Sequence, residues 1–170
     1  SGVIPFSIHA RCGFIALQIL ESLLDQNIIS KKDYDNFLKN IPTISSKFNV
    51  DLNNFLNKKI SKKIFIKRYG HLRPSTYDMS AKNYDNMIVE NFFNKNSSNI
   101  NITKSKLTVA KKIWEKNNIK ILKKLKSENF DVSQLELFNF LTKSIQGREK
   151  GKYEFTKCIN KSFEILKIVS

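Results

Sequence analysis

The chain has 170 residues, of which 41% are hydrophobic, and its 30 Lys and Arg against 15 Asp and Glu give a net charge of +15. This apolar content is enough to form the core of one domain. The low numbers of glycine (5) and proline (3) disfavour turn-rich β-sandwiches and barrels. We therefore expect an all-α, irregular multi-helix domain over residues 1–170, with a long functional loop near 70–82.

The first half of the chain predicts helices from its apolar spacing and its capping residues. Apolar residues at steps of three or four predict a helix over 5–27. Ser30 begins a second helix, with Asp33 placed to complete a capping-box-like pair, and Pro42 ends it. Thr43 is placed to cap a third helix.

A fourth helix is predicted over 61–69, with Ile64 and Phe65 facing inward. Gly70 is expected to close it in the left-handed conformation that glycine favours after a helix. The stretch 70–82 has no helical period and concentrates Gly, Pro, Ser and Thr, which predicts a loop. Further helices are predicted over 83–93, 105–117, 119–128, 133–146 and 156–169, with an exposed polar connection over 94–101.

Compartment and metal content follow from segments and residues that the sequence lacks. No apolar run approaches the ~20 residues that cross a bilayer, and the start has no signal-peptide pattern. Because the chain lacks an initiator Met and stops within an apolar pattern, we expect a fragment of a longer protein. Cys12 and Cys158, with His9 and His71, have no zinc-type spacing, so we expect no metal and a reducing, cytoplasmic location.

The basic charge has two explanations. A nucleic acid or an acidic membrane would attract it, and the lysine-rich stretches 58–68 and 104–126 could track phosphates. Alternatively, Lys, Asn, Ile and Phe share A/T-rich codons, and a low-GC genome enriches them without selection for a basic surface. The second explanation is favoured, with the lysines on solvated faces.

Three groups of polar residues break the helical pattern. Arg11 interrupts an apolar helix, either as a salt bridge or as an anion clamp. A charged knot between two predicted helices contains Arg148, Glu149 and Lys152; its alternative is a solvated turn with Thr156 as the next N-cap. The predicted loop offers an imidazole, a guanidinium, a hydroxyl, a phenol and a carboxylate. These groups either bind a ligand or form hydrogen bonds with the loop's own backbone. These loop residues are His71, Arg73, Thr76, Tyr77 and Asp78.

These stretches together resemble the middle region of phosphoenolpyruvate-synthase-like phosphotransferases of bacterial surface-polysaccharide pathways. A related Gly-His-Arg-Gly type of loop occurs in the middle domain of rifampin phosphotransferases. The closest named activity is that of L-glutamine kinase, which makes a phosphoramidate for capsule decoration. The matching residues are Ile4-Pro5-Phe6, Ala10-Arg11 and Phe14-Ile15-Ala16; Tyr69 to Pro74 with Thr76-Tyr77-Asp78; and Ile145, Arg148-Glu149, Lys152 and Phe155-Thr156.

The chain also departs from the family's pattern. Ser75 stands where the relatives have Gly, and Ala81-Lys82-Asn83 stands where they have Ser-Pro-Arg. The loss of that arginine removes one expected anion contact.

The resemblance implies three parts in the whole enzyme: an ATP-grasp part that binds ATP and Mg, a middle part that binds the acceptor, and a swivelling domain with a phosphohistidine. This chain has no Gly-rich nucleotide loop and no Ser-His swivel motif, and His71 does not match the phosphohistidine. The chain is thus expected to be the acceptor-substrate domain, inactive alone, with no cofactor of its own. Its partners would be the other two domains and a small acceptor: glutamine, a sugar or a nucleotide-linked intermediate.

The chemistry of the predicted pocket residues suggests a role for each in such a transfer. Arg73 or Arg11 would neutralise the transferred phosphoryl group or hold a substrate carboxylate, together with the Arg148, Glu149 and Lys152 knot. His71 or Asp78 would take the proton of the acceptor, and Asp78 or Glu149 would hold an ammonium group. Two alternatives remain: a basic helical module that binds nucleic acid, and a helical spacer that positions catalytic domains.

Overall fold

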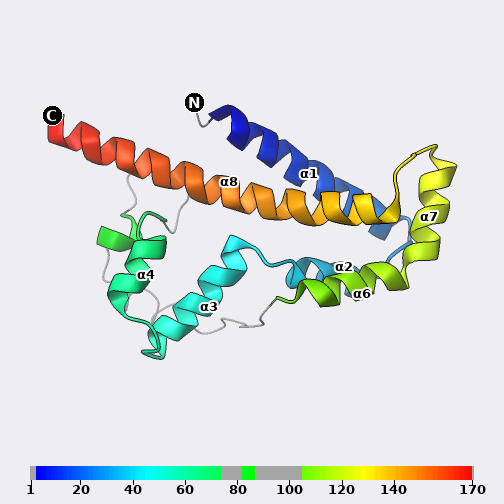
Figure 1. The fold of residues 1–170 in the computed structure, drawn as a ribbon, viewed down its shortest axis with the longest axis horizontal. Helices are drawn as coiled ribbons and strands as arrows, with labels where there is room; N and C mark the ends of the chain where they lie inside the picture. Colours follow the sequence, from blue (N-terminus) through cyan, green and yellow to red (C-terminus); the bar gives the residue numbers. More distant parts are fainter. Residues whose placement is uncertain (1–2, 74–81, 87–104, 170) are drawn as a thin grey trace. The chain divides into compact units, whose positions relative to one another are not determined.

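A computed structural model of the chain describes residues 3–73, 82–86 and 105–169 (Figure 1). Over these residues the chain forms seven α-helices and one 3-10 helix, and no strand. The predicted all-α fold is therefore confirmed. None of the described helices is both long enough and apolar enough to cross a bilayer.

The chain divides into two compact units, which we describe separately. Unit 1 comprises residues 1–43 and 104–151, and unit 2 comprises residues 44–103 and 152–170. The predicted single domain stays a prediction. The helices of unit 1 are α1 (Val3–Asp25), α2 (Lys31–Asn40), α6 (Leu107–Lys116), α7 (Asn118–Ser127) and the first part of α8 (Gln134–Val169). Those of unit 2 are α3 (Ile44–Leu56), α4 (Lys62–Tyr69), the 3-10 helix η1 (Tyr84–Asn86) and the rest of α8.

The start of α2 follows from the predicted capping chemistry, and α4 starts with a serine cap of the same kind. Ser30 precedes α2, and its Oγ accepts a hydrogen bond from the Asp33 backbone N–H at 3.1 Å. Ser61 does the same for α4 with the Ile64 backbone N–H, at 3.4 Å. Each serine satisfies a backbone donor that has no partner inside its helix. The prediction that Ser30 begins the second helix is confirmed.

Two details of the fourth helix differ from expectation. Phe65 is fully buried, but Ile64 is 44% exposed and does not face inward. Gly70 has φ −55° and ψ −33°, so the expected left-handed conformation is wrong. Glycine serves another purpose there, because a Cβ on Gly70 would lie 2.6 Å from the Ile66 carbonyl oxygen and 3.3 Å from the Asp85 Cβ. The close approach of these groups, and not a positive φ, requires the missing side chain.

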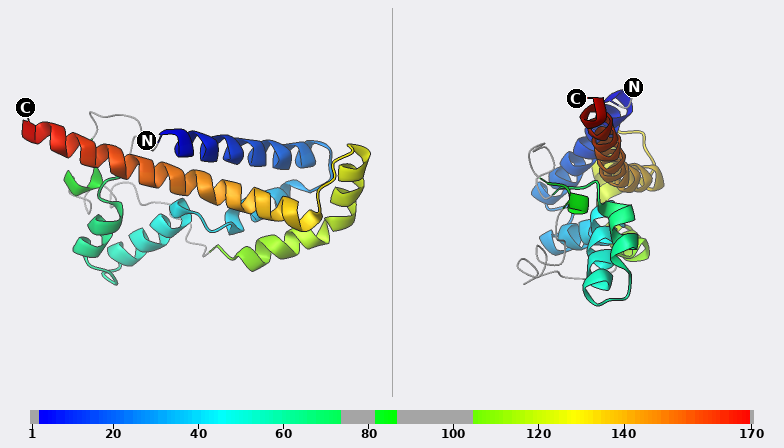
Figure 2. Two further views of the ribbon diagram at one scale, coloured as in Figure 1. Left: turned by 45° about the horizontal axis from the view of Figure 1, so that its top comes forward. Right: turned by 90° about the vertical axis from the view of Figure 1, so that its left-hand side faces the viewer.

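The predicted break at residues 148–152 is wrong, because α8 is one continuous helix and Thr156 lies inside it. Arg, Glu and Lys are good helix formers, so the charged knot continues the helix. The flanking glycine has a packing role: a Cβ on Gly147 would lie 3.1 Å from His9 Nδ1 of α1. A Cβ on Gly13 of α1 would lie 2.7 Å from the Arg148 Cβ. These glycines let α1 lie close alongside α8 within unit 1 (Figure 2).

Each unit has its own apolar core. In unit 1, the ring of Trp114 packs against those of Phe37 and Phe138, with centroids 5.8 and 6.1 Å away, and these two rings also contact each other. The Trp114 indole N–H donates to the Gln134 carbonyl at 3.2 Å, which satisfies its polar atom. The core of unit 2 is largely aromatic, and its buried residues are Leu52, Phe55, Phe65, Tyr69 and Tyr84.

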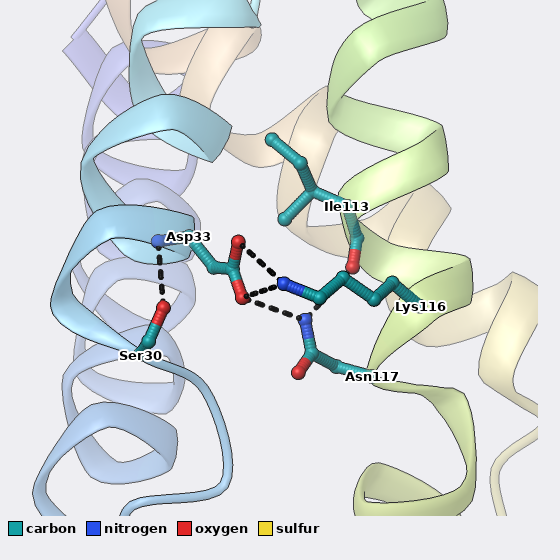
Figure 3. Close-up of polar contacts among 5 residues, drawn as sticks. All are labelled: Ser30, Asp33, Ile113, Lys116 and Asn117. Carbon is teal, nitrogen blue, oxygen red and sulfur yellow. Dashed lines mark hydrogen bonds and ion pairs between the residues drawn. The ribbon is translucent and has the colours of Figure 1, made fainter.

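Unit 1 also holds a polar cluster between α2 and α6, shown in Figure 3. The Asp33 carboxylate accepts hydrogen bonds from Lys116 Nζ at 3.1 and 3.3 Å and from Asn117 Nδ2 at 3.3 Å. Asn117 Nδ2 also donates to the Ile113 carbonyl at 2.9 Å. Burial raises the pKa of Asp33, but the hydrogen bonds with Lys116, Asn117 and Ser30 outweigh it, so the pKa lies below the ordinary value of 3.8.

Part of the prediction lies outside the described residues. The expected helix 83–93 is described only over 83–86, where η1 forms a single turn. The expected loop is described only over 70–73 and at residue 82. The expected connection over 94–101 lies outside the described residues.

Candidate functional site

The chain segment that follows α4 in unit 2 is closed by backbone hydrogen bonds. The Tyr84 N–H donates to the Leu72 carbonyl at 2.9 Å, and the Asp85 N–H donates to the Gly70 carbonyl at 3.0 Å. These bonds hold residues 70–72 beside residues 84–85. The described residues on either side of 74–81 are therefore close together in unit 2.

His71 lies against α8 in unit 2. Its ring meets the Tyr153 ring edge-on, with centroids 4.6 Å apart. Burial lowers the pKa of His71 below 6.5, the nearby charge of Lys157 lowers it further, and a backbone hydrogen bond with Tyr153 and the charge of Glu154 oppose the shift. The imidazole is therefore neutral at neutral pH. Its Nε2 atom is buried and has no hydrogen-bond partner in the part of the chain that the structure describes.

The lowered pKa of His71 predicts a pH dependence of stability. The unfolded chain binds the proton more tightly, so the free energy of unfolding falls as the pH drops through 6.5 towards the lower folded-state value. We expect His71→Phe, which preserves an edge contact with Tyr153, to remove part of this dependence. Urea unfolding of both proteins at about pH 7.5 and about pH 5.5 measures the difference. The same pH dependence in both proteins would show that His71 does not contribute.

Arg73 and Asn83 meet at Asn160 of α8, all within unit 2. Arg73 Nη2 donates to the Asn160 Oδ1 at 3.4 Å, and Asn83 Nδ2 donates to the same oxygen at 3.2 Å. Asn83 is buried, so this hydrogen bond satisfies a polar side chain removed from water. Within unit 2, His71 and Arg73 therefore both contact α8.

Sequence reasoning did not identify Tyr153, Asn83 and Asn160 as parts of the site. Asn83 had a signal, because the resemblance predicts an arginine, and thus an anion contact, at this position. In the structure this residue is a buried donor to Asn160. Tyr153 and Asn160 had no signal of their own. They are seven residues apart in sequence, and the continuity of α8 places them on one face of the helix.

Two other predicted residues, Arg148 and Arg11, lie in unit 1. The Arg148 guanidinium lies 4.5 Å from the centroid of the Phe14 ring, a cation–π contact. Arg11 is exposed and precedes Phe14 by one helical turn on α1, so the two share a helix face. Neither arginine forms an ion pair with the residues that the structure describes.

Of the remaining predicted site residues, some lie in the two units and others lie outside the described residues. Glu149 lies on α8 in unit 1, and Lys152 lies on α8 in unit 2. Thr76, Tyr77 and Asp78 lie outside the described residues. In the ranges that the structure describes, no three His, Cys, Asp or Glu side chains gather in a way that could hold a metal ion.

Comparisons of the chain with known protein families, with curated proteins and with solved structures found no match. The side chains of the candidate site therefore define what chemistry it can perform. A neutral imidazole can accept a proton, and a guanidinium can bind a carboxylate or a phosphoryl oxygen. The carboxamides of Asn83 and Asn160 add neutral polar groups beside the guanidinium of Arg73.

Proposed function

We propose that this chain is the acceptor-substrate-binding part of an ATP-dependent phosphotransferase whose phosphoryl group arrives on a phosphohistidine. The acceptor that we favour is an amino acid, with L-glutamine first, for the synthesis of a capsule phosphoramidate. The observation that carries the proposal is the neutral, half-buried His71, which α8 holds in the same unit as Arg73. The sequence resemblance includes the predicted loop that contains both residues.

The chemistry of the two side chains fits this acceptor. An amide nitrogen loses a proton when it gains a phosphoryl group, and a neutral imidazole is in the state that accepts a proton. Arg73 supplies a permanent positive charge for the carboxylate of an amino acid or for the phosphoryl oxygens. Asp78 is the second candidate base, and Thr76 and Tyr77 are further candidate contacts; these roles stay predictions.

Arg11, Arg148, Glu149 and Lys152 also remain predicted substrate contacts. Arg11 is exposed on α1, whereas Arg73 and Arg148 are partly buried. Arg148 is held against Phe14, which limits the directions its guanidinium can take. In this proposal ATP and Mg are bound by the nucleotide-binding part of the enzyme, and the phosphohistidine belongs to its swivelling part.

Isothermal calorimetry on this chain tests the proposal with L-glutamine, related amino acids, sugars and a short DNA duplex. We expect saturable binding of L-glutamine that weakens about tenfold or more in His71→Ala and in Arg73→Gln, a loss of ~1.4 kcal/mol. His9→Ala is the matched control, because His9 is an exposed histidine on α1 and should leave the affinity unchanged.

Two outcomes would contradict the proposal. Equal affinity in wild type and His71→Ala would place the acceptor elsewhere. Binding to DNA alone, with an affinity that falls steeply with salt, would instead support the basic nucleic-acid module.

A further inference from the structure

The two chain segments that flank residues 74–81 are both tied to one atom of α8. Arg73 precedes that stretch and Asn83 follows it, and both donate to the Asn160 Oδ1, at 3.4 and 3.2 Å. A carboxamide oxygen has two lone pairs, so it can accept both hydrogen bonds at once. We name this pair of hydrogen bonds the Asn160 clamp.

The Asn160 clamp adds to the backbone closure of the same loop. The hydrogen bonds from Tyr84 to Leu72 and from Asp85 to Gly70 join the two ends to each other. They do not fix the loop to α8. The Asn160 clamp and the edge contact of His71 with Tyr153 make that connection.

The spacing of Tyr153 and Asn160 explains how one helix, α8, contacts both His71 and Arg73. Tyr153 and Asn160 are seven residues apart, which is close to two helical turns, so they lie on the same face. Tyr153 contacts His71, and Asn160 accepts a hydrogen bond from Arg73, which is two positions after His71. The face of α8 therefore sets the position of both candidate side chains.

We infer that Asn160 is a positioning residue for the acceptor site: it fixes the ends of the loop on α8 and so sets where His71 and Arg73 stand. A site held by a rigid element through hydrogen bonds keeps its side chains in place more accurately than a loop alone. That this positioning serves acceptor binding rests on the proposed function. The Asn160 clamp itself can be tested without any ligand.

Amide hydrogen exchange measured by NMR tests the clamp directly. We expect Asn160→Leu, which removes the acceptor at similar volume, to raise the exchange rates of the Tyr84 and Asp85 amides about tenfold or more. Asn160→Asp retains acceptor oxygens and should preserve the wild-type rates. Lys161→Leu is the matched control, because Lys161 is the exposed neighbour on the same helix.

Unchanged Tyr84 and Asp85 exchange in Asn160→Leu would overturn the inference. If that variant also loses protection throughout α3 and α4, Asn83→Ala replaces it, because it removes one donor from the opposite side. Asn83→Ala must then raise the same two rates selectively, and unchanged rates would again overturn the inference.

Calorimetry with L-glutamine separates the clamp from the proposed function. If the wild type binds L-glutamine, we expect about tenfold weaker binding in Asn160→Leu and recovery in Asn160→Asp. Equal affinity in Asn160→Leu and wild type would show that the clamp does not position the acceptor site. If the wild type does not bind L-glutamine and the exchange rates respond as expected, the clamp stands and the proposed acceptor is wrong.

Discussion

Replacing Phe65 with alanine is expected to lower the free energy of unfolding of unit 2 by ~3–5 kcal/mol. Phe65 is fully buried, and its ring packs against those of Phe55, Tyr69 and Phe48, with centroids 5.1, 5.3 and 5.7 Å away. The loss has two parts: the favourable free energy of burying the ring away from water, and the cost of the cavity that the alanine leaves. A loss of this size is comparable with the total stability of a small domain.

The substitution of Phe65 should also disturb the position of His71 in the candidate site. Tyr69, which packs on Phe65, ends α4 immediately before Gly70 and His71. Ile64→Ala is the matched control, because Ile64 is adjacent in α4 and 44% exposed, and we expect it to cost less than ~1 kcal/mol. Urea unfolding followed by far-UV circular dichroism measures both. Equal losses in the two variants would contradict the described orientation of α4.

The second large effect is expected at the polar cluster between α2 and α6. We expect Asp33→Asn to lower the stability of unit 1 by ~1–2 kcal/mol, since it removes charge-assisted hydrogen bonds. The carboxylate accepts from Lys116 through both oxygens and from Asn117 through one of them. An amide at this position has one acceptor oxygen and would direct an N–H group at one of these donors.

Asp35→Asn is the matched control on the same helix. Asp35 pairs with Lys31 at 3.0 Å, but both side chains are more than half exposed, and we expect a change below ~0.5 kcal/mol. Chemical unfolding followed by the fluorescence of Trp114, which lies in the core of unit 1, measures both variants. A larger loss in Asp35→Asn than in Asp33→Asn would contradict the described cluster.

The same cluster has a pH signature with a definite sign. Because the folded-state pKa of Asp33 lies below 3.8, its contribution is complete above that value and is lost as the pH falls through the folded-state pKa. Asp33→Asn should therefore differ from wild type most at neutral pH. The difference should shrink in acid.

Local chemistry explains which parts of the fold could be predicted. Ser30 and Ser61 are capping residues whose side chains bond the chain three positions on, so the starts of α2 and α4 follow from short-range sequence. The continuity of α8 could not be predicted in the same way. Gly147 and Gly151 look like helix breakers until α1 is seen to pack against this stretch.

In the candidate site, too, short-range sequence indicates some residues but not the distant residues that contact them. His71 and Arg73 could be chosen as candidates because polar residues of different chemistry cluster within ten residues, 69–78. Their anchors, Tyr153 and Asn160, come from a segment about eighty residues later, which no local pattern connects with the loop. Ile64 and Phe65 make a similar point, since apolar character alone does not distinguish the buried neighbour from the exposed one.

The central claim is that His71, held on α8 in the same unit as Arg73, contacts the acceptor. The chain has two histidines, so NMR of the imidazole C–H signals observes His71 directly, with His9 as an internal control. In a titration with L-glutamine at neutral pH, we predict a saturable shift of the His71 signal and no shift of the His9 signal. A His71 signal that stays unchanged while L-glutamine is in excess, or equal shifts of both histidines, would contradict the account.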